Sequence, residues 1–180
     1  MIAVLDADVL FPMILRDTLL RVAAAGGFRA HWSDRILEEV THNLVDQHRA
    51  DEAQARRLVE TMASAFPDAR VQGWERHEAA MRNHPKDRHV AAAAQEIGAA
   101  AIVTSNLKDF AELPAGIVAQ SPDAFLLTVF EEAPDLVIGA MTKQAASYRK
   151  PAMDLLELLD TLAKPVPGFS RAVCAWLAAR

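Results

Sequence analysis

The sequence has a single cysteine, Cys174, among its 180 residues. No intrachain disulfide can form, so the fold does not require an oxidising compartment. Cys174 lies in the apolar run 169–177, and we expect it to be a buried filler of the core. Long hydrophobic runs are also missing. The N-terminal stretch MIAVLDADVLF is interrupted by aspartates too early for a signal peptide or a membrane span. These absences predict a cytoplasmic protein with no membrane partner.

A surplus of basic residues is missing as well, because the net charge is −5. Proteins that coat nucleic acid usually carry a basic surplus, so a passive coating function is disfavoured. An enzyme that keeps carboxylates for metal ions remains compatible, since bound cations reverse the local sign of the field. The chain also contains no internal repeat, low-complexity tract or flexible linker. With 52% hydrophobic residues, it can bury a substantial core.

Short apolar runs alternate with helical patterns in the first two-thirds of the chain. We expect strands at 2–5, 28–32 and 100–103, with weaker candidates at 71–74 and 117–119. Helices are expected at 16–25, 35–47, 51–65 and 86–97. This alternation predicts parallel βαβ units in an α/β fold.

The pattern changes after residue 120. From Ser121 onward only helices are expected, broken near Pro134, Pro151 and Pro165. The sequence therefore predicts an α/β domain over 1–120 and a helical extension over 121–180 that packs on it.

Acidic side chains follow two of the expected strands. Asp6 and Asp8 come directly after the first strand, and Asn106 and Asp109 follow the strand at 100–103. In open α/β sheets, ligands bind outside the carboxyl ends of the strands, so these groups are expected at one edge. The alternative is that Asp6 or Asp8 only caps the following turn.

The expected helix at 35–47 adds a further carboxylate. Its apolar stripe is made by four residues, Ile36, Leu37, Val40 and Leu44. At about 100° per residue, Glu39 lies on the flank of this stripe, while Glu38 points towards solvent. Asn43, one turn later, shares the Glu39 side. Glu39 is therefore the better candidate for a site.

Asp87 lies in the first turn of the expected helix at 86–97. Interaction with the helix dipole, worth about 0.3–1 kcal/mol, could alone explain an acid there. The position beside the strand edge favours a functional role. Lys86, Arg88 and Lys108 are candidate phosphate contacts, although each also suits an ordinary surface position. Among the histidines, only His89 is expected near the site.

Several carboxylates at one edge repel one another unless a cation lies between them. Oxygen ligands without cysteine or paired histidines indicate Mg²⁺ or Mn²⁺, not zinc. Such an ion can activate a water for in-line attack on phosphorus. The residues thus predict a metal-dependent nuclease that hydrolyses phosphodiester bonds.

Three stretches in this order resemble the PIN-domain family, which includes many toxin ribonucleases of bacterial toxin–antitoxin systems. They are IAVLDADVLF, WSDRILEEVTHNL and HPKDRHVAAAAQEIGAAAIVTSNLKDF, and they span most of the first 110 residues. Nothing after Ser121 closely resembles the common core of the family.

The resemblance implies specific roles for individual residues. The family's first three acids fall on Asp6, Glu39 and Asp87. A further family aspartate falls on Asn106, and Asp109 is inferred to supply the missing carboxylate. The implied catalytic residues and metal ligands are thus Asp6, Glu39, Asp87 and Asp109. Asp8, Asn43, Thr104 and Asn106 are left as accessory groups.

The resemblance also implies a PIN-like three-layer fold with a mainly parallel central sheet of about five strands, followed by C-terminal helices. The catalytic domain would be 1–120. The implied activity is that of a Mg²⁺- or Mn²⁺-dependent endoribonuclease. RNA, a cognate antitoxin protein and a second copy in a homodimer are the implied partners.

The sequence leaves two other interpretations open. The run IAVLDADVLF also fits a haloacid-dehalogenase-like phosphatase, with Asp6 as nucleophile and Asp8 as general acid/base. That family needs a late strand ending in paired acids, which is not expected here, and it gives Glu39 no role. Alternatively, the replacement at Asn106 could leave a catalytically impaired RNA-binding module.

Overall fold

The computed structural model describes residues 1–180, which divide into two compact units. The first unit contains Met1–Phe11 and Arg29–Ala119, and the second contains Pro12–Phe28 and Gln120–Arg180. From the sequence alone, one domain boundary is expected at residue 120. The spatial units differ from that division because Pro12–Phe28 joins the C-terminal helices. The sequence-domain boundary itself stays a prediction.

The first unit is built on a five-stranded sheet of order β3-β2-β1-β4-β5. The strands are β1 (Ile2–Leu5), β2 (Arg29–Ser33), β3 (Arg70–Val71), β4 (Ala101–Val103) and β5 (Val118–Gln120). β1 pairs in parallel with β2 and with β4, and β2 pairs in parallel with β3. The predicted α/β fold with a mainly parallel sheet of about five strands is confirmed.

β1 lies at the centre of this sheet. Val4 is opposite His31 of β2 and Ile102 of β4, and the side chains from Ala3 to Leu5 are fully buried. The chain runs outward from β1 to β2 and β3, then returns to β4 on the other side of β1. The strand order therefore reverses beside β1. In open α/β sheets, such a switch point forms the crevice where ligands bind.

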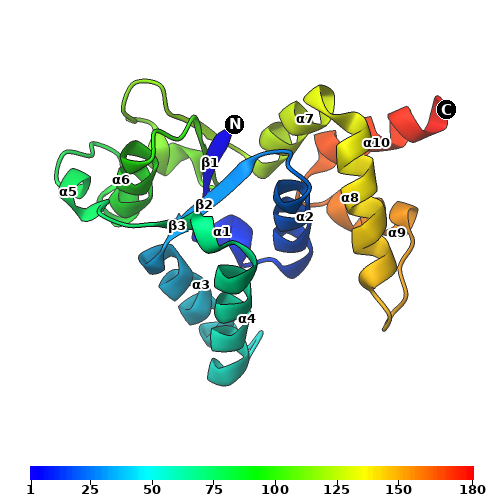
Figure 1. Ribbon diagram of the computed structural model, residues 1–180, viewed down its shortest axis with the longest axis horizontal. Helices are drawn as coiled ribbons and strands as arrows, with labels where there is room; N and C mark the ends of the chain where they lie inside the picture. The colour runs from blue at the N-terminus through cyan, green and yellow to red at the C-terminus, as the bar shows by residue number, and fades with distance from the viewer. The chain divides into compact units, whose positions relative to one another are not determined.

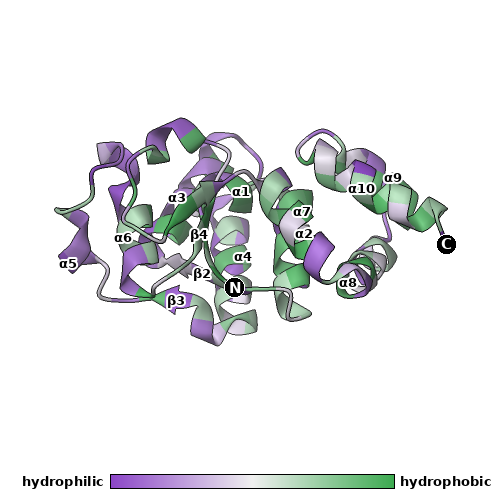
Figure 2. Ribbon diagram, turned by 90° about the horizontal axis from the view of Figure 1, so that it is seen from above, coloured by the Kyte–Doolittle hydropathy of each residue, from purple (hydrophilic) through white to green (hydrophobic).

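Five helices and three short 3₁₀ turns complete the first unit. The helices are α1 (Ala7–Leu10), α3 (Asp34–Asp46), α4 (Glu52–Ala65), α5 (Glu75–Glu78) and α6 (Arg88–Glu96). The 3₁₀ turns are η1 (Pro67–Ala69), η2 (Pro85–Asp87) and η3 (Leu107–Phe110). α6 packs against β1, β2 and β4. α3 packs against β2, α1 and α4 (Figure 1). Figure 2 shows α5 as strongly hydrophilic, which fits its place on the outside of α6.

Local sequence explains where these elements begin and end. The Ser33 side chain accepts a hydrogen bond from the Ile36 N–H and so caps α3. Gly98 follows α6 with φ +61°, a conformation that glycine adopts without strain. The expected strand at 71–74 was wrong beyond Val71. Gly73 has φ +77° and breaks the extended chain, and Trp74 precedes the unexpected helix α5.

The second unit is entirely helical. It contains α2 (Met13–Ala24), α7 (Pro122–Glu132), α8 (Pro134–Ser147), α9 (Leu155–Leu162) and α10 (Pro167–Ala178). α7, α8 and α10 each begin with proline at the first helical position, where its missing N–H costs no hydrogen bond. α2 packs against α8, and α10 packs against α7 and α9. The predicted series of C-terminal helices is confirmed.

A buried polar network fixes α2 to α8. The Thr18 hydroxyl donates to Gln144 Oε1 at 3.0 Å, and both side chains are fully buried. The Gln144 amide donates to the Tyr148 hydroxyl at 3.2 Å, which donates to Asp17 Oδ2 at 2.8 Å. Buried polar groups are costly unless paired, so these bonds specify one register of α2 on α8. They explain why Pro12–Phe28 belongs to the helical unit.

Gly168, in the first turn of α10, lies very close to the side chain of Asp123. The N–H groups of Gly168 and Phe169 donate to the Asp123 carboxylate at 3.1 and 2.8 Å. A Cβ on Gly168 would lie 2.8 Å from Asp123 Oδ2, so a side chain there would break this cap. Cys174, expected in the core, is exposed instead. It follows Val173, the buried residue of that turn, and one helical step of about 100° turns it outward.

No helix in the structure combines the length and the apolar character needed to cross a membrane.

Candidate metal centre

Asp6 lies directly after β1, at the switch point of the sheet. Its Oδ1 accepts the Ala7 N–H at 2.7 Å, and its Oδ2 accepts the hydroxyl of Thr104 at 2.8 Å. Thr104 follows β4 and is fully buried, and Asp6 is only 6% exposed. Asp6 therefore does cap the following turn, but it also faces the end of the neighbouring strand.

Asp8 lies in the first turn of α1 and shares the same threonine. Its Oδ2 accepts the Ser105 N–H at 2.9 Å and the Thr104 hydroxyl at 3.3 Å. Its other oxygen, Oδ1, is buried and has no hydrogen-bond partner. A buried carboxylate oxygen without a donor is unfavourable unless a cation or water satisfies it.

A second group of side chains comes from η2 and η3. His84, Asp87 and Asp109 each offer one ligand atom, and these atoms all lie within 4.8 Å of one another. His84 Nδ1 lies 3.5 Å from Asp87 Oδ2, and the His84 N–H donates to the Asp109 carbonyl oxygen at 3.0 Å. The structure thus joins Asp87 and Asp109, as the sequence predicts, and adds a histidine that the sequence analysis did not place there.

Asn106 links the end of β4 to Asp109. Its side-chain amide donates to Asp109 Oδ2, and its backbone N–H donates to the Thr104 hydroxyl oxygen at 3.1 Å. This one residue therefore contacts both Asp109 and the threonine that holds Asp6 and Asp8. The arrangement suits an orienting group more than a direct replacement for a carboxylate.

Glu39, on α3, lies beside the buried His89. It is half-buried, with 32% of its side chain exposed, and its Oε1 lies 3.1 Å from Nε2 of His89 without hydrogen-bond geometry. His89 on α6 is fully buried and packs edge-on to Trp74, with ring centroids 6.1 Å apart. The imidazole therefore connects the helix that carries Glu39 with the helix that follows Asp87.

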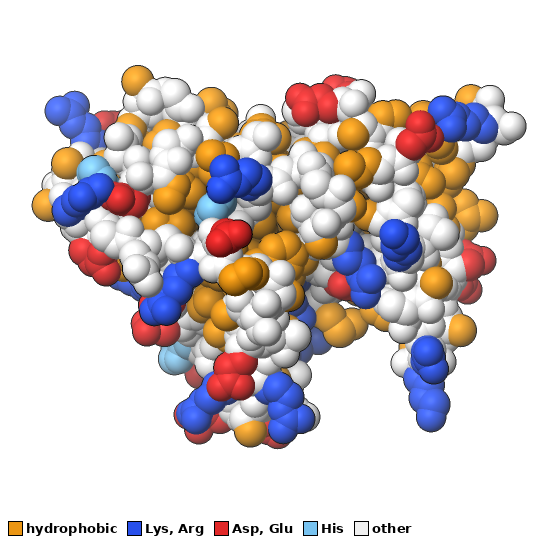
Figure 3. All heavy atoms as spheres, in the orientation of Figure 1, with side chains coloured by type: hydrophobic (Ala, Val, Ile, Leu, Met, Phe, Trp, Pro, Cys, Tyr) orange, Lys and Arg blue, Asp and Glu red, His pale blue; other side chains and the backbone are white.

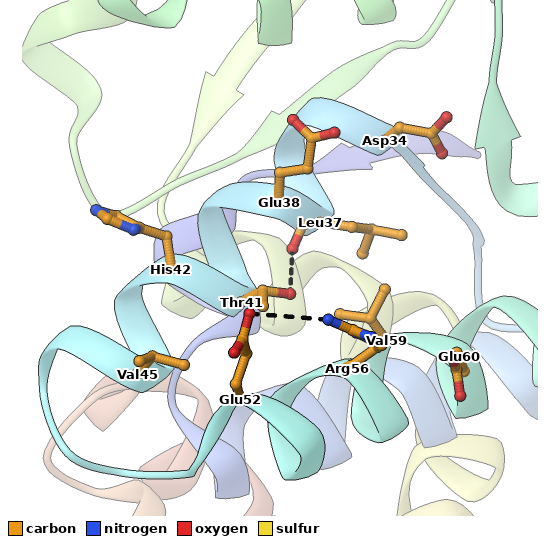
Figure 4. A pocket seen from close by; sticks show the side chains of 10 residues that line it. All are labelled: Asp34, Leu37, Glu38, Thr41, His42, Val45, Glu52, Arg56, Val59 and Glu60. Atoms are coloured by element: carbon orange, nitrogen blue, oxygen red, sulfur yellow. Dashed lines mark hydrogen bonds and ion pairs between the residues drawn. The ribbon is translucent and has the colours of Figure 1, made fainter.

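Glu38 points elsewhere, which confirms the predicted difference between the two faces of α3. It is exposed and lines a groove of about 530 Å³ between α3 and α4. Figure 4 shows Leu37, Val45 and Val59 along this groove, with Glu38 at its upper end. Four acids line the groove, Asp34, Glu38, Glu52 and Glu60. Charged side chains of both signs gather on the surface over α4 (Figure 3).

The electrostatics show that the acids act on one another. Burial, and then the neighbouring Asp8 carboxylate, raise the pKa of Asp6 from 3.8 to about 7. Burial also raises the pKa of Asp8, with a further contribution from Asp87. The pKa of Asp87 is raised by burial and by Asp109. Negative charge is therefore in excess around these four acids, Asp6, Asp8, Asp87 and Asp109.

A divalent cation fits these residues. The unpartnered Oδ1 of Asp8 and the mutually repelling carboxylates are both relieved by a positive ion. The donors are mostly carboxylate oxygens, which suit Mg²⁺ and Mn²⁺.

The remaining candidates lie around the cluster. Asn43 follows Glu39 by one helical turn and is half-buried. Lys86 and Lys108 are exposed, in η2 and η3 respectively. Arg88 begins α6, and its Nε donates to the Asn83 carbonyl oxygen at 3.4 Å. Lys86 lies close enough to Asp87 to lower its pKa. Contact of these cations with phosphate stays a prediction.

Sequence reasoning missed part of this centre. His84 was not expected near the site, although its spacing of three from Asp87 in HPKD could have indicated a shared turn. The Ser105 N–H and the contact between His89 and Glu39 depend on tertiary packing, so no local pattern could have revealed them.

Comparison with known proteins agrees with this architecture. The sequence profile described as "PIN domain" matches residues 3–108, more than half of the chain. The profile described as "VapC50 C-terminal domain" matches residues 122–175. No solved structure gives a significant match.

A curated relative from Mycobacterium tuberculosis is named "Putative ribonuclease VapC50". It is 45% identical over 98 residues, which cover 51% of this chain and 56% of the relative. The aligned stretch thus spans about half the length of that relative.

The matched range 3–108 contains the switch-point acids, Glu39 and Asp87, and ends one residue before Asp109. It leaves the phosphatase interpretation without support, since that motif would belong to another family. The chain belongs to the PIN-domain family.

Proposed function

We propose that this protein is a toxin-like, metal-dependent endoribonuclease that hydrolyses phosphodiester bonds of RNA. The observation that carries the proposal is the concentration of carboxylates at the switch point. Asp8 Oδ1 is buried without a partner, and the pKa of Asp6 is raised to about 7 beside it. Such a site is poorly stable until a cation enters, which is the property expected of a metal-binding catalytic centre.

The metal ligands in this proposal are Asp6, Glu39, Asp87 and Asp109, with Mg²⁺ or Mn²⁺ as the ion. When bound, the ion lowers the pKa of a coordinated water and neutralises charge that develops on the phosphate. Thr104 holds the Asp6 carboxylate by its hydroxyl, and Asn106 orients Asp109. Lys86, Arg88 and Lys108 would bind neighbouring phosphates of the RNA backbone.

The groove between α3 and α4 is not the expected path of the RNA. Its lining carries four carboxylates against Arg56 and His42, and Arg56 lies 3.7 Å from Glu52. An acidic groove repels the phosphate backbone, whereas the basic residues of η2, η3 and α6 lie beside the acid cluster.

The partners are proposed by analogy. The relative is named "Putative ribonuclease VapC50", and the resemblance to toxin ribonucleases of the PIN-domain family implies an antitoxin partner. We infer that this chain also has a cognate antitoxin, acts in the cytoplasm and forms a homodimer. Sedimentation of the purified chain alone tests the homodimer. Sedimentation of the chain mixed with a candidate antitoxin tests the antitoxin.

The activity is tested with labelled single-stranded RNA and a single-stranded DNA of the same sequence. Each is incubated with Mg²⁺, with Mn²⁺ or with EDTA. Asp6→Asn is the inactivating variant, because it removes a charged ligand at nearly constant volume. Glu38→Gln is the matched control, since Glu38 is an exposed acid outside the cluster.

Cleavage of RNA that requires the metal ion, disappears in Asp6→Asn and persists in Glu38→Gln is the expected result. Cleavage of DNA alone would contradict the proposed substrate. Binding of RNA without cleavage would favour the catalytically impaired module, which Asn106 in place of a family carboxylate motivates.

A further inference from the structure

We propose that His84 is a nitrogen ligand of the bound cation, together with Asp87 and Asp109, and that the site therefore prefers Mn²⁺ to Mg²⁺. This inference rests on the proposed function and specifies its cofactor. One ligand atom from each of the three residues lies within 4.8 Å of the others. Opposite ligands of an ion with bonds of roughly 2.1 Å are about 4.2 Å apart, so small side-chain movements suffice to close this set around one ion.

The backbone holds His84 beside the acids. Pro85 follows it and favours an extended conformation at the preceding residue, and His84 has φ −51° and ψ 132°. The His84 N–H donates to the Asp109 carbonyl oxygen at 3.0 Å. The His84 carbonyl oxygen accepts the Asp87 N–H at 2.9 Å. Both metal-binding acids are thus tied through the main chain to the same histidine.

The imidazole is not engaged in a strong competing bond. Nδ1 lies 3.5 Å from Asp87 Oδ2, which is too long for a strong hydrogen bond. The His84 side chain is 53% exposed, so it has room to turn towards an ion. His42 provides a contrast, because its Nε2 lies 3.0 Å from Oδ2 of Asp46, one turn further along α3. That pair is an ordinary surface interaction within one helix.

The residue before His84 also has polar side-chain atoms without a partner. Asn83, the residue before His84, is only 3% exposed, and neither Nδ2 nor Oδ1 of its side chain has a partner. Buried amide groups are almost always hydrogen-bonded, and an ion or its coordinated water can satisfy such atoms.

The mixed ligand set decides between the two ions. Mg²⁺ takes oxygen ligands and keeps its waters, whereas Mn²⁺, as a first-row transition ion, accepts an imidazole nitrogen more readily than Mg²⁺ does. Replacing one oxygen by the His84 nitrogen therefore gains affinity for Mn²⁺ and little for Mg²⁺. The remaining positions around the ion would be available for Asp6, Glu39 and a water or phosphate oxygen.

The experiment uses Mn²⁺ alone as the probe, on the full chain at pH 7.5. Calorimetry measures the affinities for Mn²⁺ and Mg²⁺, and pulsed electron paramagnetic resonance detects ¹⁴N coupled to the bound Mn²⁺. The variants are His84→Ala and the matched control His42→Ala. Both residues are exposed histidines that contact one aspartate, so neither change should disturb the core.

We expect ¹⁴N coupling in the unchanged protein and in His42→Ala, and its loss in His84→Ala. The Mn²⁺ affinity should fall about tenfold or more in His84→Ala, in the range found when a metal-site interaction is removed, while the Mg²⁺ affinity changes by less than about threefold. Coupling that persists in His84→Ala would assign the nitrogen to another imidazole and overturn the inference. Mn²⁺ binding without ¹⁴N coupling, with RNA cleavage intact, would overturn this inference alone. No Mn²⁺ binding at all would overturn the proposed function with it.

Discussion

The Thr104 hydroxyl donates a hydrogen bond to Asp6 Oδ2, with 2.8 Å between the two oxygens. This bond joins the carboxyl ends of two neighbouring strands, β1 and β4. The same hydroxyl lies 3.3 Å from Asp8, and its oxygen accepts the N–H of Asn106. One buried threonine therefore orients several groups of the proposed metal centre.

Thr104→Val tests this role. The change keeps the shape of the side chain but removes the hydroxyl, so Asp6 loses a neutral donor and can rotate. We expect RNA cleavage to fall at least about tenfold, with weaker Mn²⁺ binding, and Thr104→Ser to restore both. Initial rates and calorimetry measure the two effects. Equal activity of the valine and serine variants would show that the hydroxyl has no orienting role.

The pH dependence of stability tests the charge state of Asp6. Its pKa is raised from 3.8 to about 7 in the folded protein, so between these values the folded state keeps a proton that the unfolded state has lost. The contribution of Asp6 is therefore fully present below about pH 4 and is lost as the pH rises towards 7.

The measurement is urea unfolding in EDTA from pH 4.5 to 8, for the unchanged protein and Asp6→Asn. As the pH rises, the unchanged protein should lose unfolding free energy relative to Asp6→Asn. This loss should continue to about pH 7 and then level off. A difference that does not change with pH would contradict the raised pKa. Added Mn²⁺ should reverse the trend, because the ion binds the carboxylate form.

Glu39 and Glu38 form a matched pair of substitutions on one helix. Glu39→Gln removes a charge beside His89, where its Oε1 lies 3.1 Å from Nε2, and should reduce cleavage at least about tenfold. Glu38→Gln changes an exposed residue of the α3–α4 groove and should leave the rate within about twofold. Rates at saturating Mn²⁺ separate the two. The opposite ranking would show that the wrong face of α3 was assigned to the site.

The helical unit offers a prediction about stability. Thr18→Val removes the buried donor to Gln144 Oε1 and leaves that oxygen unsatisfied, which should cost about 1–3 kcal/mol of unfolding free energy. Thr61→Val is the control, since Thr61 is exposed on α4 and only donates to its own helix. Urea unfolding monitored by circular dichroism measures both. Equal losses in the two variants would mean that the α2–α8 network adds little.

Much of the fold was predictable because local patterns decide it. The apolar run before Asp6, the cap at Ser33 and the prolines at helix starts each act over a few residues. The different exposures of Glu38 and Glu39 followed from helical geometry alone. The short helix α5 was missed because it has only four residues and no apolar stripe, and its start depends on the conformation of Gly73.

The details of the site were less predictable. Asp6, Asp8 and Asp109 could be placed at one sheet edge from their positions after strands, but their roles as ligands stay predictions. The contribution of His84 depends on a loop that folds back onto η3 through one backbone hydrogen bond. The association of α2 with α8 depends on partners 126 residues apart, and no local pattern encodes such a contact.

The path of the chain between the two units limits how recombination can exchange the helical unit. The family profile for residues 3–108 includes α2, yet Asp17 and Thr18 of α2 form their hydrogen bonds with Tyr148 and Gln144 at the end of α8, within the helical unit. The polypeptide crosses between the units three times, after Phe11, Phe28 and Ala119. A recombination event that joins a different sequence after residue 120 would therefore remove the buried hydrogen-bond partners of α2. Recombination can replace the helical unit without breaking these hydrogen bonds only if residues 12–28 are replaced together with it.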